Sequence, residues 1–207
     1  MTLIKKITTD RTQQDERSRG RSCSDLLGQL EDPNPIARRW AVREIVGCPG
    51  AADALVERLR AEPEAIVREA IFTSLTRVGD AAAVRGLVDC LRSEDAVLRN
   101  GAIEAMQQLP AEVAPIMRRL LIDPDPDVRI FAVNILESLR HPEVEAWLIE
   151  VLDQDPHVNV CATAVDLLGE VGTAAAQEPL GRLKARFASE PYIQFAADLA
   201  LRRASGI

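Results

Sequence analysis

The stretch DPDPDVRIFAVNIL, residues 123–136, decides the fold of this chain. It begins with prolines and acidic residues and continues with Val128 and Arg129, after which Ala132 and Leu136 stand four residues apart. Proline and acidic side chains are both favourable in the first turn of a helix. Apolar residues four apart share one helix face. The stretch therefore predicts a turn followed by a helix that packs closely through Ala132.

The same pattern recurs along the chain, which indicates a repeat architecture. The blocks cover residues 32–38, 62–68, 94–99, 123–129 and 153–159, so they end 30, 31, 30 and 30 residues apart. A weaker sixth block covers 190–194. A small or branched apolar residue follows three positions after each block: Ala41, Ile71, Ala102, Ala132, Ala162 and Ala197. The fifth copy has Asp166 four positions later, where most other copies are apolar, so we expect its register to slip by one or two residues.

A second Leu-rich segment lies between successive blocks, and Gly or Pro separates the two segments of most repeats. About twelve helices in six pairs are expected, and no segment has the alternating pattern of a strand. The predicted fold is an all-α, right-handed α–α superhelix, a solenoid with one continuous core over residues 23–207.

Composition narrows the class of protein further. The chain has 207 residues, of which 47% are hydrophobic and only 3% aromatic, as expected for packed Leu-, Val- and Ala-rich helices. A net charge of −7 argues against a nucleic-acid partner. No apolar run in the sequence is long enough to span a membrane, so we expect no membrane helix. We also expect no secretory signal. Because the four cysteines, Cys23, Cys48, Cys90 and Cys161, fit no zinc or redox spacing, we expect reduced thiols and a cytoplasmic protein.

Residues 1–22 differ from the rest of the chain. They hold six basic and three acidic residues, a net charge of +3, and few large apolar residues. This composition predicts a flexible basic arm. It could contact an acidic partner, nucleic acid or the acidic repeats, or simply aid solubility, and we favour the last interpretation.

The repeated pattern of Leu-rich helix, Asp-Pro turn, Val-Arg, Ala and Leu resembles the short HEAT-like repeats of phycobilisome lyases and many bacterial proteins. The resemblance extends from residue 23 to about residue 204, and residues 123–136 match best. It implies a helical repeat fold but leaves function open, because such repeats occur in scaffolds, lyases and DNA glycosylases.

The recurring arginines have two interpretations: a ladder for anionic ligands, or a structural ladder of acid–arginine pairs between repeats. We favour the structural one, since acidic residues recur six positions before most of the arginines. The predicted ladder consists of Arg38, Arg68, Arg99 and Arg129 with Asp32, Glu62 and Asp123, and Asp153 occupies the acidic position of the fifth copy. Either Asp123 or Asp127 is the expected partner of Arg129.

The resemblance implies that the second helix of each pair lines the concave face, so residues that vary there are candidates for partner binding. The candidate residues are Arg39, Trp40, Arg43, Glu69, Thr73, Asn100, Glu104 and Asn134. The row continues with apolar residues, including Ile130, Val160, Ala164, Phe195 and Leu199, which could simply be packed. For Trp40 a place in the core is slightly favoured over a contact role.

No sequence motif indicates catalysis, a metal or a cofactor. His141 and His157 stand beside prolines in expected turns, and Asp123, Asp125 and Asp127 lack the glycine and distal glutamate of a calcium loop. The expected function is a non-enzymatic scaffold that binds a protein segment on its concave face. Alternatives implied by the resemblance are a lyase or chaperone for a tetrapyrrole-bearing protein and, last, a DNA glycosylase.

Overall fold

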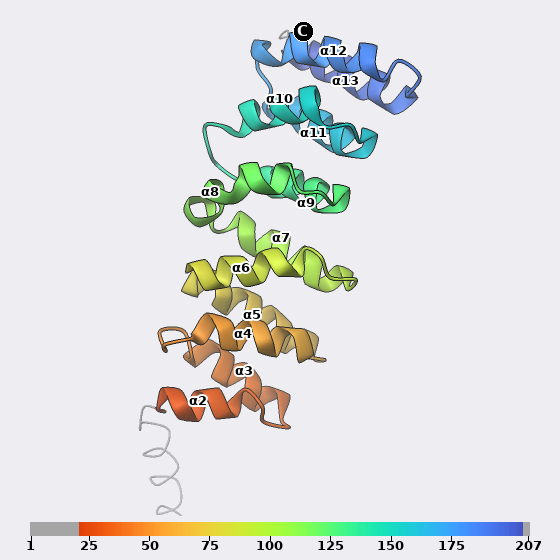
Figure 1. Ribbon diagram of the computed structural model, residues 1–207. Helices are drawn as coiled ribbons and strands as arrows, with labels where there is room; N and C mark the ends of the chain where they lie inside the picture. Colours follow the sequence, from red (N-terminus) through yellow and green to blue (C-terminus); the bar gives the residue numbers. More distant parts are fainter. Residues whose placement is uncertain (1–20, 205–207) are drawn as a thin grey trace, which may run out of the picture. The chain divides into compact units, whose positions relative to one another are not determined.

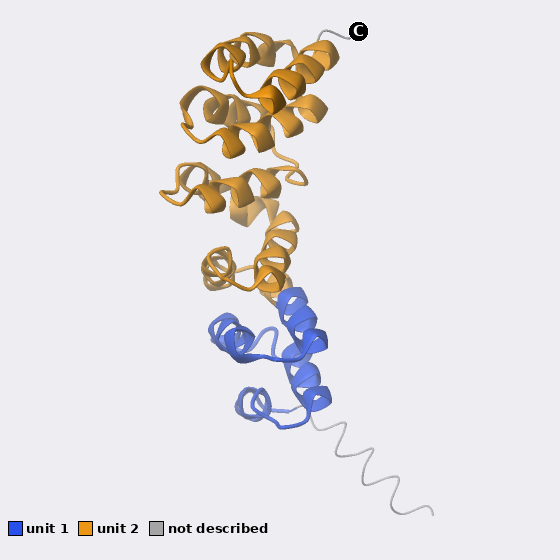
Figure 2. Ribbon diagram, turned by 90° about the vertical axis from the view of Figure 1, so that its right-hand side faces the viewer, with its two compact units in different colours: residues 1–74 blue, residues 75–207 orange. Residues whose placement is uncertain are grey.

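The structure is a computed structural model that describes residues 21–204 (Figure 1). The described part contains twelve α-helices and one short 3-10 helix, with no strand, so the predicted all-α fold is confirmed. Almost all of the predicted basic arm, residues 1–22, lies outside the described residues. The chain divides into two compact units, residues 1–74 and 75–207 (Figure 2). A single repeat body over residues 23–207 stays a prediction.

The first unit contains α2 (Cys23–Gln29), α3 (Pro35–Glu44), α4 (Ala51–Ala61) and most of α5 (Ala65–Val78). The start of α3 follows from its sequence: the Asn34 side chain accepts a hydrogen bond from the amide of Ile36, and Pro35 occupies the first turn. The first backbone amides of a helix have no partner inside it. The Asn34 side chain supplies an acceptor for one of them, and Pro35 has no amide hydrogen to satisfy. The core of this unit consists mainly of aliphatic side chains, among them Leu26, Ile45, Leu55, Leu59 and Ile71.

The second unit consists of helix pairs. Its helices are α6 (Ala81–Cys90), α7 (Ala96–Gln107), α8 (Pro110–Leu121), α9 (Pro126–Leu136), α10 (Val144–Gln154), α11 (Val158–Val171), α12 (Gln177–Arg186) and α13 (Pro191–Ala204), with η1 (Ala174–Ala176) before α12. Within the pairs, α6 packs on α7, α8 on α9, α10 on α11 and α12 on α13. Between pairs, the second helices α7, α9, α11 and α13 contact one another in order.

Small residues form the predicted seams between helices. Ala41, Ala102, Ala132 and Ala197 are completely buried. In the fifth repeat, however, Ala162 is only half-buried, and Ala164 and Leu168 occupy the core instead. The cause is the start of α11 at Val158, after the N-cap His157, which moves the repeat pattern by two residues. The expected slip of register is thereby confirmed.

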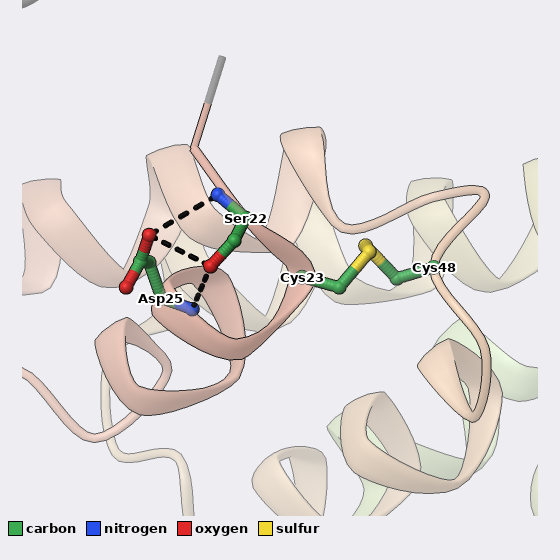
Figure 3. The surroundings of a disulfide bond; sticks show 4 residues. All are labelled: Ser22, Cys23, Asp25 and Cys48. Carbon is green, nitrogen blue, oxygen red and sulfur yellow. Dashed lines mark hydrogen bonds between the residues drawn. A yellow bond between two sulfur atoms is a disulfide. The ribbon is translucent and has the colours of Figure 1, made fainter. Parts of the chain in front are cut away.

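A disulfide joins Cys23, the first residue of α2, to Cys48 in the turn after α3 (Figure 3). The expectation that all four cysteines are reduced is therefore wrong for this pair, although Cys90 and Cys161 are free and buried. Sequence spacing could not find the pair, because the two residues meet only when α2 packs on α3. Because this disulfide is present, the cysteines no longer support the expectation of a reducing, cytoplasmic compartment.

Candidate functional site

Arg38, the first arginine of the repeat pattern, forms hydrogen bonds to two neighbouring turns of the first unit. One turn contains Asp32 and the other contains Glu62. The Arg38 guanidinium donates to both carboxylate oxygens of Glu62, at 2.8 and 2.6 Å, and to the carbonyl of Asp32 at 2.8 Å. Both side chains are buried. The hydrogen bond to Glu62 raises the pKa of Arg38, whereas burial of Glu62 is outweighed by its hydrogen bonds, so the pKa of Glu62 is lowered.

Arg129 repeats this geometry in the second unit. It donates to both oxygens of Asp155, at 2.6 and 3.0 Å, and to the carbonyl of Asp123 at 2.7 Å. The expected partner, the carboxylate of Asp123 or Asp127, is therefore wrong: the acid comes from the following repeat. The Asp123 carboxylate is instead 2.5 Å from Arg92. Arg68 and Arg99 donate to backbone carbonyls six residues earlier, those of Glu62 and Ser93.

In each of five repeats, a polar side chain stands six residues before the arginine position and has the same local role. It accepts a hydrogen bond from the backbone amide two residues later and so fixes the turn before the second helix. The pairs are Asp32–Asn34, Glu62–Glu64, Ser93–Asp95, Asp123–Asp125 and Asp155–His157. The fifth member is thus Asp155 rather than the expected Asp153, whose carboxylate pairs with Arg182.

Cys161 occupies the arginine position of the fifth repeat, four residues after the N-cap of its helix. Its thiol is 3.3 Å from the carbonyl of Asp155, six residues earlier. Arg186, from α12, donates to that same carbonyl at 3.0 Å and to the Cys161 sulfur at 3.2 Å. An arginine from the next repeat thus supplies the missing guanidinium. Burial raises the pKa of Cys161, so the thiol is poorly suited to act as a nucleophile.

The candidate partner-binding residues of the first unit lie on the surface of α3 and α5, which are neighbours in Figures 1 and 2. Trp40 is 54% exposed, so its interpretation as a core residue is wrong. Arg43 is exposed and Arg39 half-buried on the same helix. Glu69 and Thr73 are exposed on α5. Ile36, four residues before Trp40, is also exposed, at 65%.

The remaining candidates belong to the second unit. Asn100 and Glu104 are exposed on α7, and Asn134 is half-buried on α9. In the apolar continuation of the row, Val160 and Ala164 are fully buried, so they are packing residues. Phe195 and Leu199 differ from them because they are 67% and 41% exposed on α13.

Two grooves lie between neighbouring second helices of the second unit. One, of about 230 Å³, is lined by Val133, Asn134, Glu137, Thr163, Asp166, Leu167 and Glu170. The other, of about 210 Å³, lies between α11 and α13 and shares Asp166 and Glu170 with the first. The sequence reasoning overlooked Glu137, Asp166 and Glu170 as surface residues. Asp166 occupies in α11 the position that Asn134 occupies in α9 and Leu199 in α13, and the two-residue shift of α11 hid this equivalence.

Residues 21–204 contain no group of three or more His, Cys, Asp or Glu side chains arranged to hold a metal ion. His141 stacks on the buried Trp147, with ring centroids 4.9 Å apart, and His157 is the N-cap residue of α11. No helix of the described chain has the length and apolar character needed to span a membrane.

Stacked helix pairs with equivalent polar contacts in each turn define an α-helical repeat protein of the solenoid class. The HEAT-repeat family model matches residues 24–107 and 113–202. The chain belongs to the HEAT-repeat family.

Several solved structures are similar to the chain. A designed armadillo repeat protein in complex with a (KR)4 peptide is 18% identical, with a TM-score of 0.46 over 89% of this chain and 100% of that chain. The CpcE–CpcF complex of phycocyanin lyase from Nostoc sp. PCC7120 is 17% identical, with a TM-score of 0.38 over 89% and 95% of the two chains. These likenesses carry no argument about function. No curated protein matches the chain.

Proposed function

We propose that this protein is a non-enzymatic interaction module that binds a segment of another protein on the second helices of its repeats. In the first unit the binding residues are Arg39, Trp40, Arg43, Glu69 and Thr73. Asn100, Glu104 and Asn134 are the corresponding residues of the second unit. The observation that carries the proposal is the exposure of Trp40, 54%, between two arginines of the same helix.

Trp40 and its neighbours have the composition of a binding hot spot. Ile36 and Trp40 stand four residues apart, so they lie on one side of α3 and form a continuous apolar surface. Arg39 and Arg43 form a second row beside it by the same spacing. Trp and Arg are among the residue types that contribute most to protein–protein affinity. Burial of this apolar pair under a partner would favour binding.

The charge of this helix indicates the chemistry of the partner. Two arginines beside an exposed indole favour a segment that carries acidic residues next to a large apolar residue. The arginines would mainly accelerate association and fix register, while the apolar contact would contribute most to affinity. No described side chain indicates tetrapyrrole or DNA-repair chemistry, so the lyase and glycosylase alternatives are not proposed.

The test uses a labelled synthetic peptide in which aspartates flank two leucines, with binding followed by fluorescence anisotropy. The double variant Arg39→Ala/Arg43→Ala should bind about tenfold more weakly, and Trp40→Ala should also lose affinity. The matched control is Arg85→Ala/Arg119→Ala, which removes two exposed arginines from α6 and α8. Equal losses in both double variants would show a general charge effect and refute the assigned site.

A further inference from the structure

A second surface, in the other unit of the chain, combines exposed apolar side chains with carboxylates. We call it the α11–α13 groove and define it by Asp166 and Glu170 of α11, Tyr192, Phe195 and Leu199 of α13, and the adjoining Glu137 of α9. The first five line the groove between α11 and α13, and Glu137 lines the neighbouring groove together with Asp166 and Glu170.

The apolar side of the groove is supplied by one helix. Tyr192, Phe195 and Leu199 stand three and four residues apart on α13, so they follow one face of it. Their exposed fractions are 54%, 67% and 41%, although the same helix buries Ile193, Ala196, Ala197 and Ala200. An aromatic and aliphatic face that remains exposed beside a groove is characteristic of a contact surface.

The carboxylates on the acidic side of the groove form no ion pairs within the described residues. Glu137, Asp166 and Glu170 are exposed, and among residues 21–204 no basic side chain forms an ion pair with any of them. Two carboxylates on the first helices of the same unit are different, because they form ion pairs. Glu150 pairs with Arg118 at 2.8 Å, and Asp153 pairs with Arg182 at 2.8 Å.

Two further contacts fix the shape of the groove. The Tyr192 hydroxyl donates to Asp166 at 2.7 Å, which links the aromatic side to the acidic side; this hydrogen bond raises the pKa of Tyr192. Arg203, the basic residue that lines this groove, donates to the carbonyl of Gly169 at 3.0 Å. Its guanidinium therefore contacts the backbone of α11.

We propose that the α11–α13 groove binds a protein segment in which lysines or arginines flank a large apolar residue. The basic side chains would pair with Glu137, Asp166 and Glu170, and the apolar residue would pack on Phe195 and Leu199. The acidic charge of the groove opposes nucleic acid, which leaves a basic polypeptide as the occupant. This surface lies outside the one proposed around Trp40 and selects a partner of opposite charge.

The probe is a short labelled peptide in which lysines flank two leucines, titrated with the full chain while anisotropy is measured. Binding should weaken with added salt, and the double variant Asp166→Asn/Glu170→Gln should bind about tenfold more weakly. Phe195→Ala should lose affinity with unchanged salt dependence. The matched control, Glu57→Gln/Glu112→Gln, makes the same change in net charge at exposed residues outside the groove and should bind like the parent protein.

Peptides with glutamate in place of lysine, or serine in place of leucine, should bind much more weakly. Three results would overturn the proposal: no binding of the Lys/Leu peptide, equal binding of the glutamate peptide, or equal losses in the groove and control variants. Circular dichroism establishes first that each variant is folded. The acidic peptide and the Arg39/Arg43 variants test the surface around Trp40, so either proposal can fail while the other stands.

Discussion

At the scale of single residues, the most informative side chains are the arginines four positions after the N-cap of the second helices. Arg129 joins the turn before its own helix to Asp155 of the next repeat, and Asp155 is only 6% exposed. Its guanidinium satisfies a buried carboxylate and a carbonyl at once. Loss of one member of such a pair leaves the other charge buried without compensation.

We therefore expect Arg129→Ala to lower the free energy of unfolding by about 3 kcal/mol, within the range for breaking a buried pair. Chemical denaturation followed by circular dichroism measures the change. Arg119→Ala, at an exposed position of α8, is the control and should cost less than about 0.5 kcal/mol. An Arg129→Ala protein with parental stability would contradict the structural role. Peptide binding should remain after correction for unfolding.

The sequence predicts the arginine position of each second helix, but it does not predict all the side chains that contact the arginine. Recurrence of an acid and an arginine indicates a repeated turn contact, and the structure has that contact. The pairing of Arg129 with Asp155, and the replacement of the fifth arginine by Arg186 from another helix, depend on the packing of successive repeats. Periodicity within one repeat contains no information about which neighbouring side chain reaches a turn.

At the scale of helices, the seams depend on small residues. Ala132 is fully buried within α9, which packs on both α7 and α11. The Ala132→Phe variant should overpack this seam and cost about 1–3 kcal/mol or more. Its melting temperature should fall, whereas Ala146→Phe, at an exposed position of α10, should change it little. Ala102→Phe should behave like Ala132→Phe, and unchanged melting of both variants would contradict the register.

Helix faces could be predicted well from the spacing of apolar residues, because burial of one face is what the sequence pattern encodes. The exposed Trp40 and Phe195 could not be separated from core residues in this way, since each directly precedes a buried alanine, Ala41 or Ala196. Helix starts were harder to place. The blocks align on a proline-containing or acidic turn, and Asn34 and Asp125 are N-caps that directly precede a proline, whereas the N-cap of α11 is His157, which follows Pro156. That difference moved the fifth repeat by two residues.

At the scale of the whole molecule, acid should weaken the fold through the carboxylates of the turns. The folded-state pKa values of Glu62 and Asp123 are both lowered, because hydrogen bonds from Arg38 and Arg92 outweigh the effect of burial. Groups of this kind stabilise the fold above their unfolded pKa values, near about 4, and lose that contribution as pH falls through the folded values.

We accordingly expect urea denaturation midpoints to be nearly constant from about pH 7 to about pH 5 and to fall steadily below about pH 4. We expect the Glu62→Gln variant to be less stable at neutral pH, because it loses the buried pair with Arg38, and its acid-dependent fall to be smaller, because one titrating group is absent. A parental protein whose midpoint rises as pH decreases through this range would contradict the assigned direction of the shifts.

The bond between Cys23 and Cys48, 25 positions apart, gives the first repeat a covalent topology that differs from the rest of the chain. Residues 23 to 48 form a closed ring, from which the basic N-terminal residues and the remaining repeats extend as two tails. A single proteolytic cut inside this ring, for instance in the turn between α2 and α3, leaves both products joined through sulfur. A cut in any later turn separates them. The oxidised first repeat can therefore be nicked without losing its connection to the residues that precede it.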